Sequence, residues 1–199
     1  MKNAWLKILA GFRQFREKYV LGDNDIMQQL SHRGQQPEIM VVSCCDSRVD
    51  PAVILQCDPG DLFVVRNVAN IIPPYEKDEA HHGVSAALEF AVCFLKVKHL
   101  ILLGHSQCGG INTLINHNHT KNDFISNWVS LIKKAKESAQ QTDDVAKEAL
   151  KISYQHALTF PWIKAALDQQ QLMIHLWFFD VAQGQIFTFD EKNKQFTVL

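Results

Sequence analysis

The ten residues 39–48, IMVVSCCDSR, join a run of apolar side chains to a group of ionisable ones. The first half, Ile39 to Ser43, is short, apolar and flanked by turn residues, which is typical of a strand buried on both faces. The second half, Cys44 to Arg48, places two thiols, a carboxylate and a guanidinium where that strand ends. Functional groups of open parallel sheets gather at the carboxyl ends of the strands. This stretch therefore predicts a central strand and a chemically active edge of a sheet.

Strand-like and helix-like segments alternate outward from this stretch. Two further apolar runs, Leu62 to Val65 and Leu100 to Leu103, predict strands, and the segment between them, Gly83 to Lys96, repeats apolar residues at helical intervals. Parallel neighbours need a crossover connection, usually a helix. The alternation therefore predicts an α/β fold with a central, mainly parallel β-sheet flanked by helices.

The C-terminal part of the chain differs in pattern. Phe124 to Asp168 is mostly helical, with a break or a helix start at Pro161. Two β-rich runs, Leu172 to Phe179 and Gln185 to Phe189, flank the turn-like residues 181–184. They predict an antiparallel hairpin at the C-terminal edge of the sheet.

The N-terminus is expected to form a helical arm, residues 1–34 of a single domain that spans residues 1–199. Asp23 to His32 predicts a second helix after the first, which runs from Met1 to Tyr19. The first helix carries an apolar stripe made of Trp5, Ile8, Leu9, Phe12 and Phe15. We expect this stripe to pack on the chain's own core or on a partner subunit, and binding to a membrane surface is a weaker alternative.

The composition excludes several classes of protein. The chain has 20 Lys and Arg against 21 Asp and Glu, a formal net charge of -1, and no basic cluster is dense enough to track nucleic-acid phosphates. Apolar residues (47%) and charged residues (21%) occur in the proportions of soluble globular proteins. Since the sequence offers neither a secretory signal nor an apolar run of membrane-spanning length, we expect a cytoplasmic protein with no nucleic-acid partner.

The five cysteines, an odd count without a secretory signal, argue against disulfides. In a reducing cytosol thiols persist, and a cysteine spaced with a histidine then indicates metal binding or nucleophilic chemistry. Cys57 and Cys93 lie in apolar segments and are expected to be buried thiols, and Cys45 is expected to point away from Cys44. The isolated histidines are expected to be surface or core residues: His32, His99, His117, His119, His156 and His175. The pair His81–His82 could instead assist proton transfer.

A second strand end also carries ligand-type side chains. Residues 104–110 are GHSQCGG, so His105 and Cys108 stand three apart at a strand-to-helix turn, with both side chains on one side. If this strand adjoins the one that ends at Cys44, the three side chains converge. Two thiolates and an imidazole suit Zn²⁺, and three protein ligands leave the fourth tetrahedral position for water, as catalytic zinc sites require. Gly109-Gly110 would let the backbone approach closely, and amides at the helix start would stabilise a thiolate.

Asp46 and Arg48 stand two apart, so an ion pair between them is sterically easy. A carboxylate clamped by arginine stays ionised near neutral pH. Beside a metal-bound water, Asp46 would accept a hydrogen bond and orient the attacking hydroxide. The alternative is a purely structural salt bridge at the strand end, and the neighbouring Cys44 favours the catalytic role.

These residues resemble the two signatures of the β-class carbonic anhydrases, Cys-x-Asp-Ser-Arg at 44–48 and His-x-x-Cys-Gly-Gly at 105–110. The resemblance is strong over residues 35–114. It implies Zn²⁺ held by Cys44, His105 and Cys108, and reversible hydration of carbon dioxide to bicarbonate and a proton through zinc-bound hydroxide. It also implies a homodimer or homotetramer whose N-terminal helices embrace the partner, with active sites at the interface.

The same resemblance implies a substrate pocket. Its lining residues would be Gln35, Phe63 and Val68, with the amide of Gly109 as a donor to substrate. Phe90 stands where plant-like members carry a tyrosine, so the apolar wall is kept and a hydroxyl is lost. Some bacterial members have a bicarbonate-inhibited site built around a tryptophan shortly before the first zinc cysteine. Val41 stands at that place, so we expect an open form without that regulation.

Three alternative functions use the same residues. A hydrolase of carbonyl sulfide or carbon disulfide would act on linear isosteres of carbon dioxide at the same zinc site. A thiol enzyme such as a phosphatase would use Cys44 or Cys45 with Arg48, but its phosphate-binding loop needs more residues between cysteine and arginine. In a non-catalytic zinc-binding protein, the Asp46–Arg48 pair beside the metal would have no function.

Overall fold

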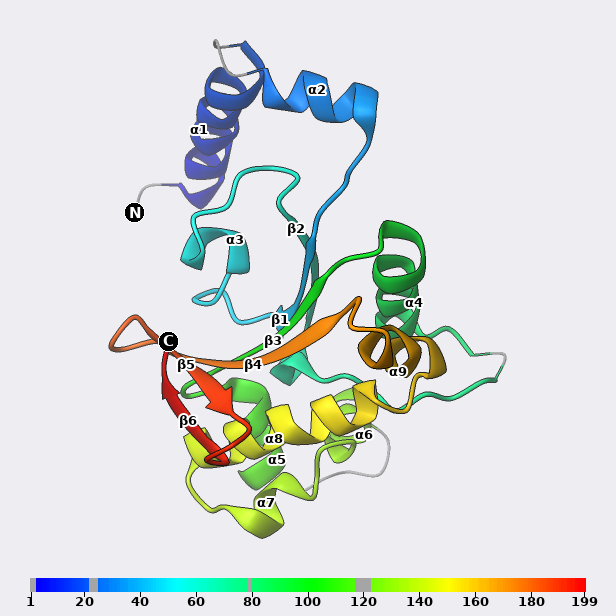
Figure 1. Cartoon of the computed structure of the whole chain (residues 1–199). Helices are drawn as coiled ribbons and strands as arrows, with labels where there is room; N and C mark the ends of the chain where they lie inside the picture. Colours follow the sequence, from blue (N-terminus) through cyan, green and yellow to red (C-terminus); the bar gives the residue numbers. More distant parts are fainter. Residues whose placement is uncertain (1–2, 22–24, 79, 117–122) are drawn as a thin grey trace.

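The computed structural model describes residues 3–21, 25–78, 80–116 and 123–199. A six-stranded sheet, ordered β2-β1-β3-β4-β5-β6, lies at its centre (Figure 1). The strands are β1 (Ile39–Cys44), β2 (Leu62–Asn67), β3 (His99–His105), β4 (Met173–Asp180), β5 (Gln185–Asp190) and β6 (Gln195–Val198). The pairs β1–β2, β1–β3 and β3–β4 are parallel, whereas β4–β5 and β5–β6 are antiparallel. The predicted α/β fold, with a mainly parallel sheet and an antiparallel C-terminal edge, is confirmed.

The helices follow the predicted segments. They are α1 (Ala4–Arg16), α2 (Ile26–Arg33), α3 (Pro51–Ile54), α4 (Gly83–Glu89), α5 (Gly109–Asn116), α6 (Phe124–Ser130), α7 (Ala135–Ser138), α8 (Thr142–Ala157) and α9 (Pro161–Asp168). Two of them continue as π-helical segments, α1 through Glu17–Leu21 and α4 through Phe90–Leu95. Pro161 begins α9, where its missing N–H costs no hydrogen bond. The sequence did not predict α3 or β6, because elements of four residues are too short to show a periodicity.

Most of the core lies on one face of the sheet. On β1, Met40 and Val42 face the helices that follow β2 in the chain, and all these elements share one large cluster of buried residues. The helices contribute Leu88, Ile111, Val129, Leu150 and Ile163, among others. On the opposite face, Val41 packs with Ile101 and Leu103 in a much smaller cluster. Both faces of β1 are therefore buried, which explains why its sequence is apolar without alternation.

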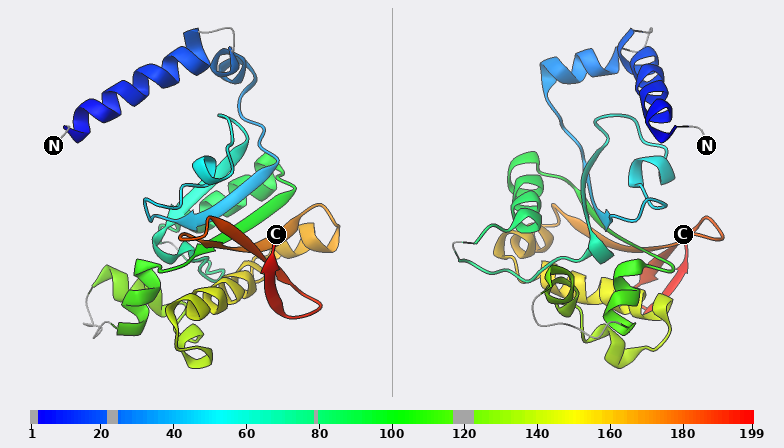
Figure 2. Two further views of the ribbon diagram at one scale, coloured as in Figure 1. Left: turned by 90° about the vertical axis from the view of Figure 1, so that its left-hand side faces the viewer. Right: turned by 180° about the vertical axis from the view of Figure 1, so that it is seen from behind.

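The N-terminal helices α1 and α2 project from the body as an arm (Figures 1 and 2). No residue of α1 is buried, and the side chains of Trp5, Ile8 and Phe12 are 64%, 64% and 59% exposed. Beyond the helix, the Tyr19 hydroxyl donates to a carboxylate oxygen of Asp58 at 2.7 Å. The apolar stripe of α1 thus does not pack on the chain's own core, which leaves a partner subunit as the expected site of packing and a membrane surface as the weaker alternative. Among the described helices, none combines the length and apolar character needed to span a bilayer.

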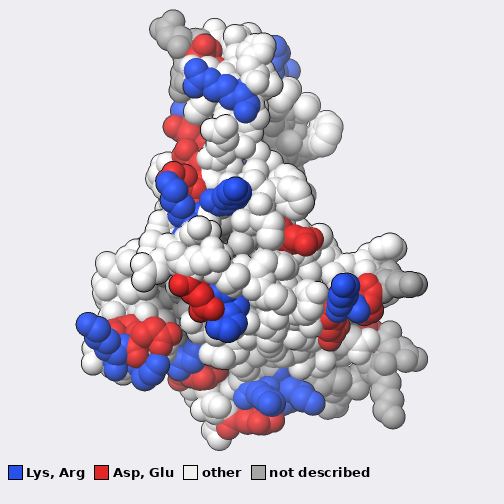
Figure 3. Space-filling model, turned by 45° about the vertical axis from the view of Figure 1, so that its right-hand side comes forward, with Lys and Arg blue, Asp and Glu red and all other residues white. Residues whose placement is uncertain are grey.

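Charged side chains of both signs are mixed on one face of the molecule. On the face shown in Figure 3, Lys and Arg lie next to Asp and Glu, and wide uncharged areas separate the groups. No broad basic area occurs on this face, as the nearly balanced composition predicts.

Candidate metal centre

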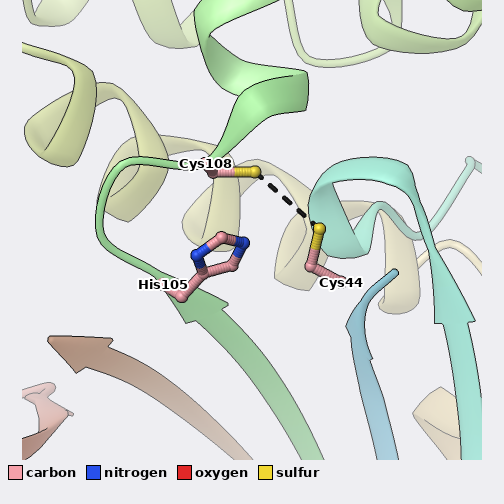
Figure 4. A group of neighbouring side chains, drawn as sticks. All are labelled: Cys44, His105 and Cys108. Atoms are coloured by element: carbon pink, nitrogen blue, oxygen red, sulfur yellow. Dashed lines mark hydrogen bonds between the residues drawn. The ribbon is translucent and has the colours of Figure 1, made fainter. Parts of the chain in front are cut away.

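The carboxyl ends of β1 and β3 bring three ligand-type side chains together. Cys44 is the last residue of β1, His105 is the last of β3, and Cys108 precedes α5. The three side chains point toward one another (Figure 4), with the two Sγ atoms 3.9 Å apart and all three potential ligand atoms within 4.8 Å of one another. All three are buried. β1 and β3 are hydrogen-bonded neighbours, so the sheet itself sets this convergence.

The imidazole of His105 is oriented for metal binding. Its Nδ1 lies 2.9 Å from the carbonyl oxygen of Ser106, to which it can donate, and this leaves Nε2 facing the two thiols. Among the described residues, Nε2 of His105 is the only buried side-chain nitrogen or oxygen without a hydrogen-bond partner. A buried polar atom left in this way costs free energy, which a bound metal ion would remove. The donor set of two sulfurs and one nitrogen fits Zn²⁺.

The two thiols affect each other's protonation. The hydrogen bond from Cys108 lowers the pKa of Cys44 to about 4, and the same bond raises the pKa of Cys108 well above its ordinary value. The backbone N–H groups of Gly110 and Ile111 at the start of α5 act in the opposite direction on the pKa of Cys108. A divalent ion beside the pair would favour the thiolate form of both.

Asp46 and Arg48 form a bidentate ion pair next to this cluster. One Asp46 oxygen accepts from both the backbone N–H and Nε of Arg48 at 2.9 Å, and the other accepts from Nη2 at 2.7 Å. The arginine hydrogen bonds hold the pKa of Asp46 well below its ordinary value of 3.8. Oδ2 of Asp46 also lies 4.0 Å from Nε2 of His105. The pair therefore places an ionised acceptor at the edge of the cluster.

Arg66 of β2 is a residue of the site that the sequence analysis missed. Its guanidinium donates to the carbonyl oxygens of Cys44 and Asp46 at 2.9 and 2.8 Å, and to a carboxylate oxygen of Asp50 at 2.7 Å. It thus fixes the loop between the first ligand and α3. The sequence did contain a signal for this role, an arginine in a mostly apolar strand, because a partly buried cation needs hydrogen-bond acceptors or anions as partners.

The turn Val68–Asn70 packs against the start of α5. A Cβ atom placed on Gly110 would lie 2.6 Å from Cγ1 of Val68, whereas one on Gly109 would have no neighbour within 4 Å. The turn is closed by Asn67, whose side chain both accepts from and donates to the backbone of Ile71. Close packing within the chain therefore requires glycine at position 110, whereas no neighbour among the described residues requires it at position 109.

The predicted pocket residues fall into two groups. Val68 and Gly109 lie at the edge of the sheet that carries the cluster. Gln35 precedes the opposite end of β1, which is about 17 Å long. Phe63 pairs with Met40 at that same opposite end, and its ring lies 5.9 Å from the ring of Phe90. Within one chain, Gln35, Phe63 and Phe90 are therefore not brought to the cluster.

The remaining cysteines take no part in the cluster. Cys45 is exposed, as its position next to Cys44 predicts, and Cys57 is only half-buried. Cys93 is exposed, so the prediction that it is a buried thiol is wrong. It lies in the segment Phe90–Leu95, whose outer side has no cover from this chain.

Among the described residues, four of the six histidines outside the cluster have identified partners. His82 lies 2.7 Å from a carboxylate oxygen of Asp78, and Nδ1 of His156 lies 2.8 Å from the carbonyl oxygen of Ile72. His99 and His175 are partly buried residues outside the metal cluster, and their ring nitrogens lie 3.0 Å apart across β3 and β4. His117 and His119 lie outside the described residues.

Comparisons with known proteins point to one family. Residues 39–186 match a family described as carbonic anhydrase. The carbonic anhydrase of Synechocystis sp. is 33% identical over 196 residues (92% of this chain, 70% of that protein), and that of Synechococcus elongatus is 31% identical over 192 residues (90% and 70%).

Solved structures extend the similarity to the fold. The β-carbonic anhydrase CcaA has a TM-score of 0.90 and 31% identity, with 99% of this chain and 100% of that chain covered. A tetrameric β-carbonic anhydrase from the ascomycete Sordaria macrospora has a TM-score of 0.82 and 27% identity, with 94% and 97% covered.

Proposed function

Because the chain belongs to the β-carbonic anhydrase family, we propose that it hydrates carbon dioxide reversibly, with Zn²⁺ held by Cys44, His105 and Cys108. The observation that carries this proposal is the unpartnered, buried Nε2 of His105, which faces two thiols. When bound there, zinc supplies a Lewis acid that makes a water molecule acidic enough to act as a nucleophile near neutral pH.

The chain's own residues orient the reactants. Asp46, kept ionised by Arg48, accepts a hydrogen bond from the attacking water and so turns a lone pair of that water toward the carbon atom of carbon dioxide. The backbone N–H of Gly109 donates to a substrate oxygen, and Val68 supplies apolar surface for a substrate with no charge or net dipole. None of these groups has to move a large distance, because the sheet edge and the arginine contacts hold them in place.

Stopped-flow measurement of carbon dioxide hydration tests this function on purified protein. We expect fast hydration, about one zinc ion per chain, loss of activity after removal of zinc with a chelator, and recovery when zinc is added back. Carbonyl sulfide and carbon disulfide are assayed on the same sample. Zinc-loaded protein that leaves carbon dioxide untouched but hydrolyses the sulfur compounds would replace this proposal with the hydrolase alternative.

We further propose that the chain self-associates. α1 exposes an aromatic stripe, and Phe90 and Phe94 are 42% and 70% exposed in a helical segment that is apolar all round. Such helices are normally buried. β2 lies at the edge of the sheet, with backbone groups open to another strand. A solved relative from Sordaria macrospora is tetrameric.

Self-association would also explain why some of the predicted pocket residues lie at the far edge of the sheet. Gln35, Phe63 and Phe90 lie too far from their own chain's cluster to contact a substrate there. In a dimer they would complete the site of the partner, so the active site would lie at the interface.

Light scattering coupled to size-exclusion chromatography tests the assembly. We expect a mass of at least two chains for the native protein, and a shift toward the monomer with reduced hydration for Phe12→Glu, because a charge in the aromatic stripe opposes burial. Phe124→Glu, at an exposed phenylalanine of α6, is the control and should keep the native mass. A fully active native monomer would contradict the proposal.

A further inference from the structure

The loop between His105 and Cys108 contains a residue in an unfavourable backbone conformation. Gln107 has a φ of 53°, in the left-handed region that residues with a side chain rarely adopt. Such a conformation persists when surrounding contacts hold it. Since this residue lies between two metal ligands, whatever holds it also sets where those ligands lie.

The backbone of Gln107 is held on both sides. Its N–H donates to Oδ1 of Asp143 at 2.7 Å, and its carbonyl oxygen accepts from Nη2 of Arg48 at 3.3 Å. Asp143 comes from the first turn of α8, a helix anchored in the main core by Val145 and Leu150. The carboxylate is therefore presented from a rigid element.

The first half of the loop has its own support from β4. The N–H of Ser106 donates to the carbonyl oxygen of Phe179 at 2.9 Å, and the hydroxyl of Ser106 accepts from the N–H of Val181 at 2.9 Å. His105 is thus fixed without Asp143. The second half, which leads to Cys108, depends on the contacts of Gln107.

We propose that Asp143 is a positioning residue of the metal centre: its carboxylate holds Gln107 in the left-handed conformation and thereby directs Cys108 toward the metal. This role rests on the zinc site proposed above. Asp144 is a matched comparison in the same helical turn, because it is exposed and forms an ion pair with Lys147 at 3.7 Å.

Zinc affinity, measured by competition with a chelator, tests the role of Asp143. We expect Asp143→Ala to weaken zinc binding by about 10-fold or more, which is the usual effect of losing a group that orients a ligand. The absorption spectrum of the Co²⁺-substituted protein should also change, since it reports the thiolate–metal geometry. Asp143→Asn keeps an oxygen acceptor and should bind zinc nearly as the native protein does. Asp144→Ala also loses a first-turn carboxylate and should leave affinity and spectrum unchanged.

A second substitution separates positioning from a general effect on stability. Glycine adopts the left-handed conformation without steric cost, so Gln107→Gly in the Asp143→Ala background should restore most of the zinc affinity. Equal zinc affinity in Asp143→Ala and Asp144→Ala would overturn the proposal, as would a double variant no better than the single one. If Asp143→Ala alone does not fold, the double variant must fold and bind zinc for the proposal to stand. Zinc affinity and the Co²⁺ absorption spectrum do not depend on hydration activity. Their results therefore test the role of Asp143 independently of the proposed reaction.

Discussion

Cys44→Ser should remove zinc from the protein and lower carbon dioxide hydration by about a thousand-fold or more. A serine hydroxyl stays protonated near neutral pH and is a poor ligand for zinc, so the site would keep one thiol and one imidazole. Enzymes accelerate reactions by about 10⁶-fold or more. A zinc enzyme loses most of this acceleration when it loses the metal that generates the nucleophile. Metal analysis and stopped-flow hydration on the same sample measure both effects.

Cys45→Ser is the matched control for this substitution. Cys45 is the next residue in the chain, but it is exposed and lies outside the cluster. The control should keep about one zinc per chain and nearly native activity. A chelator should lower the melting temperature of the control and not that of Cys44→Ser, because a ligand stabilises only a protein that binds it. Full zinc content and activity in Cys44→Ser would refute the ligand assignment.

The sequence predicted the central part of the fold because local patterns determine it. Residues 39–42 all have apolar side chains, as expected for a strand buried on both faces, and the structure places Val41 and Val42 in two different clusters. The ligand set was also accessible, because His105 and Cys108 are separated by one turn and Cys44 ends the neighbouring strand.

Other features depend on contacts between distant parts of the chain, and no local pattern reports them. Asp143 bonds a loop residue 36 positions earlier, and Arg66 bonds carbonyl oxygens some 20 positions earlier. Cys93 lies in an apolar segment whose outer side is open in one chain, so its sequence resembles that of a buried element. For Gln35 and Phe63 the sequence could suggest a pocket, but it could not say whether one chain forms that pocket alone.

Asp46→Asn should lower kcat for hydration by about 10²- to 10³-fold while zinc content stays at the native level. Asparagine has nearly the same shape, but it presents an amide N–H₂ in place of one carboxylate oxygen. It cannot accept hydrogen bonds at both positions from Arg48 and also from the attacking water. Loss of a group that takes part in proton handling typically has this magnitude. Asp168→Asn is the control and should keep native activity. Among the described residues, this exposed aspartate is paired only with Lys164.

The pH dependence of this variant tests whether Asp46 stays ionised over the range in which hydration is measured. The hydrogen bonds from Arg48 lower the pKa of Asp46 below its ordinary value of 3.8, so the folded state favours the ionised form. Asp46 therefore stays charged at every pH above that value, and the charge is lost only as the pH falls further. The ratio of native to Asp46→Asn activity should consequently be constant over about pH 6 to 9, where carboxylates of ordinary or lowered pKa do not titrate. Arg48→Lys should give a smaller loss than Asp46→Asn, because lysine keeps a positive charge beside the carboxylate although its ammonium cannot make the bidentate contact. Near-native activity in Asp46→Asn would instead assign the pair a structural role at the end of β1.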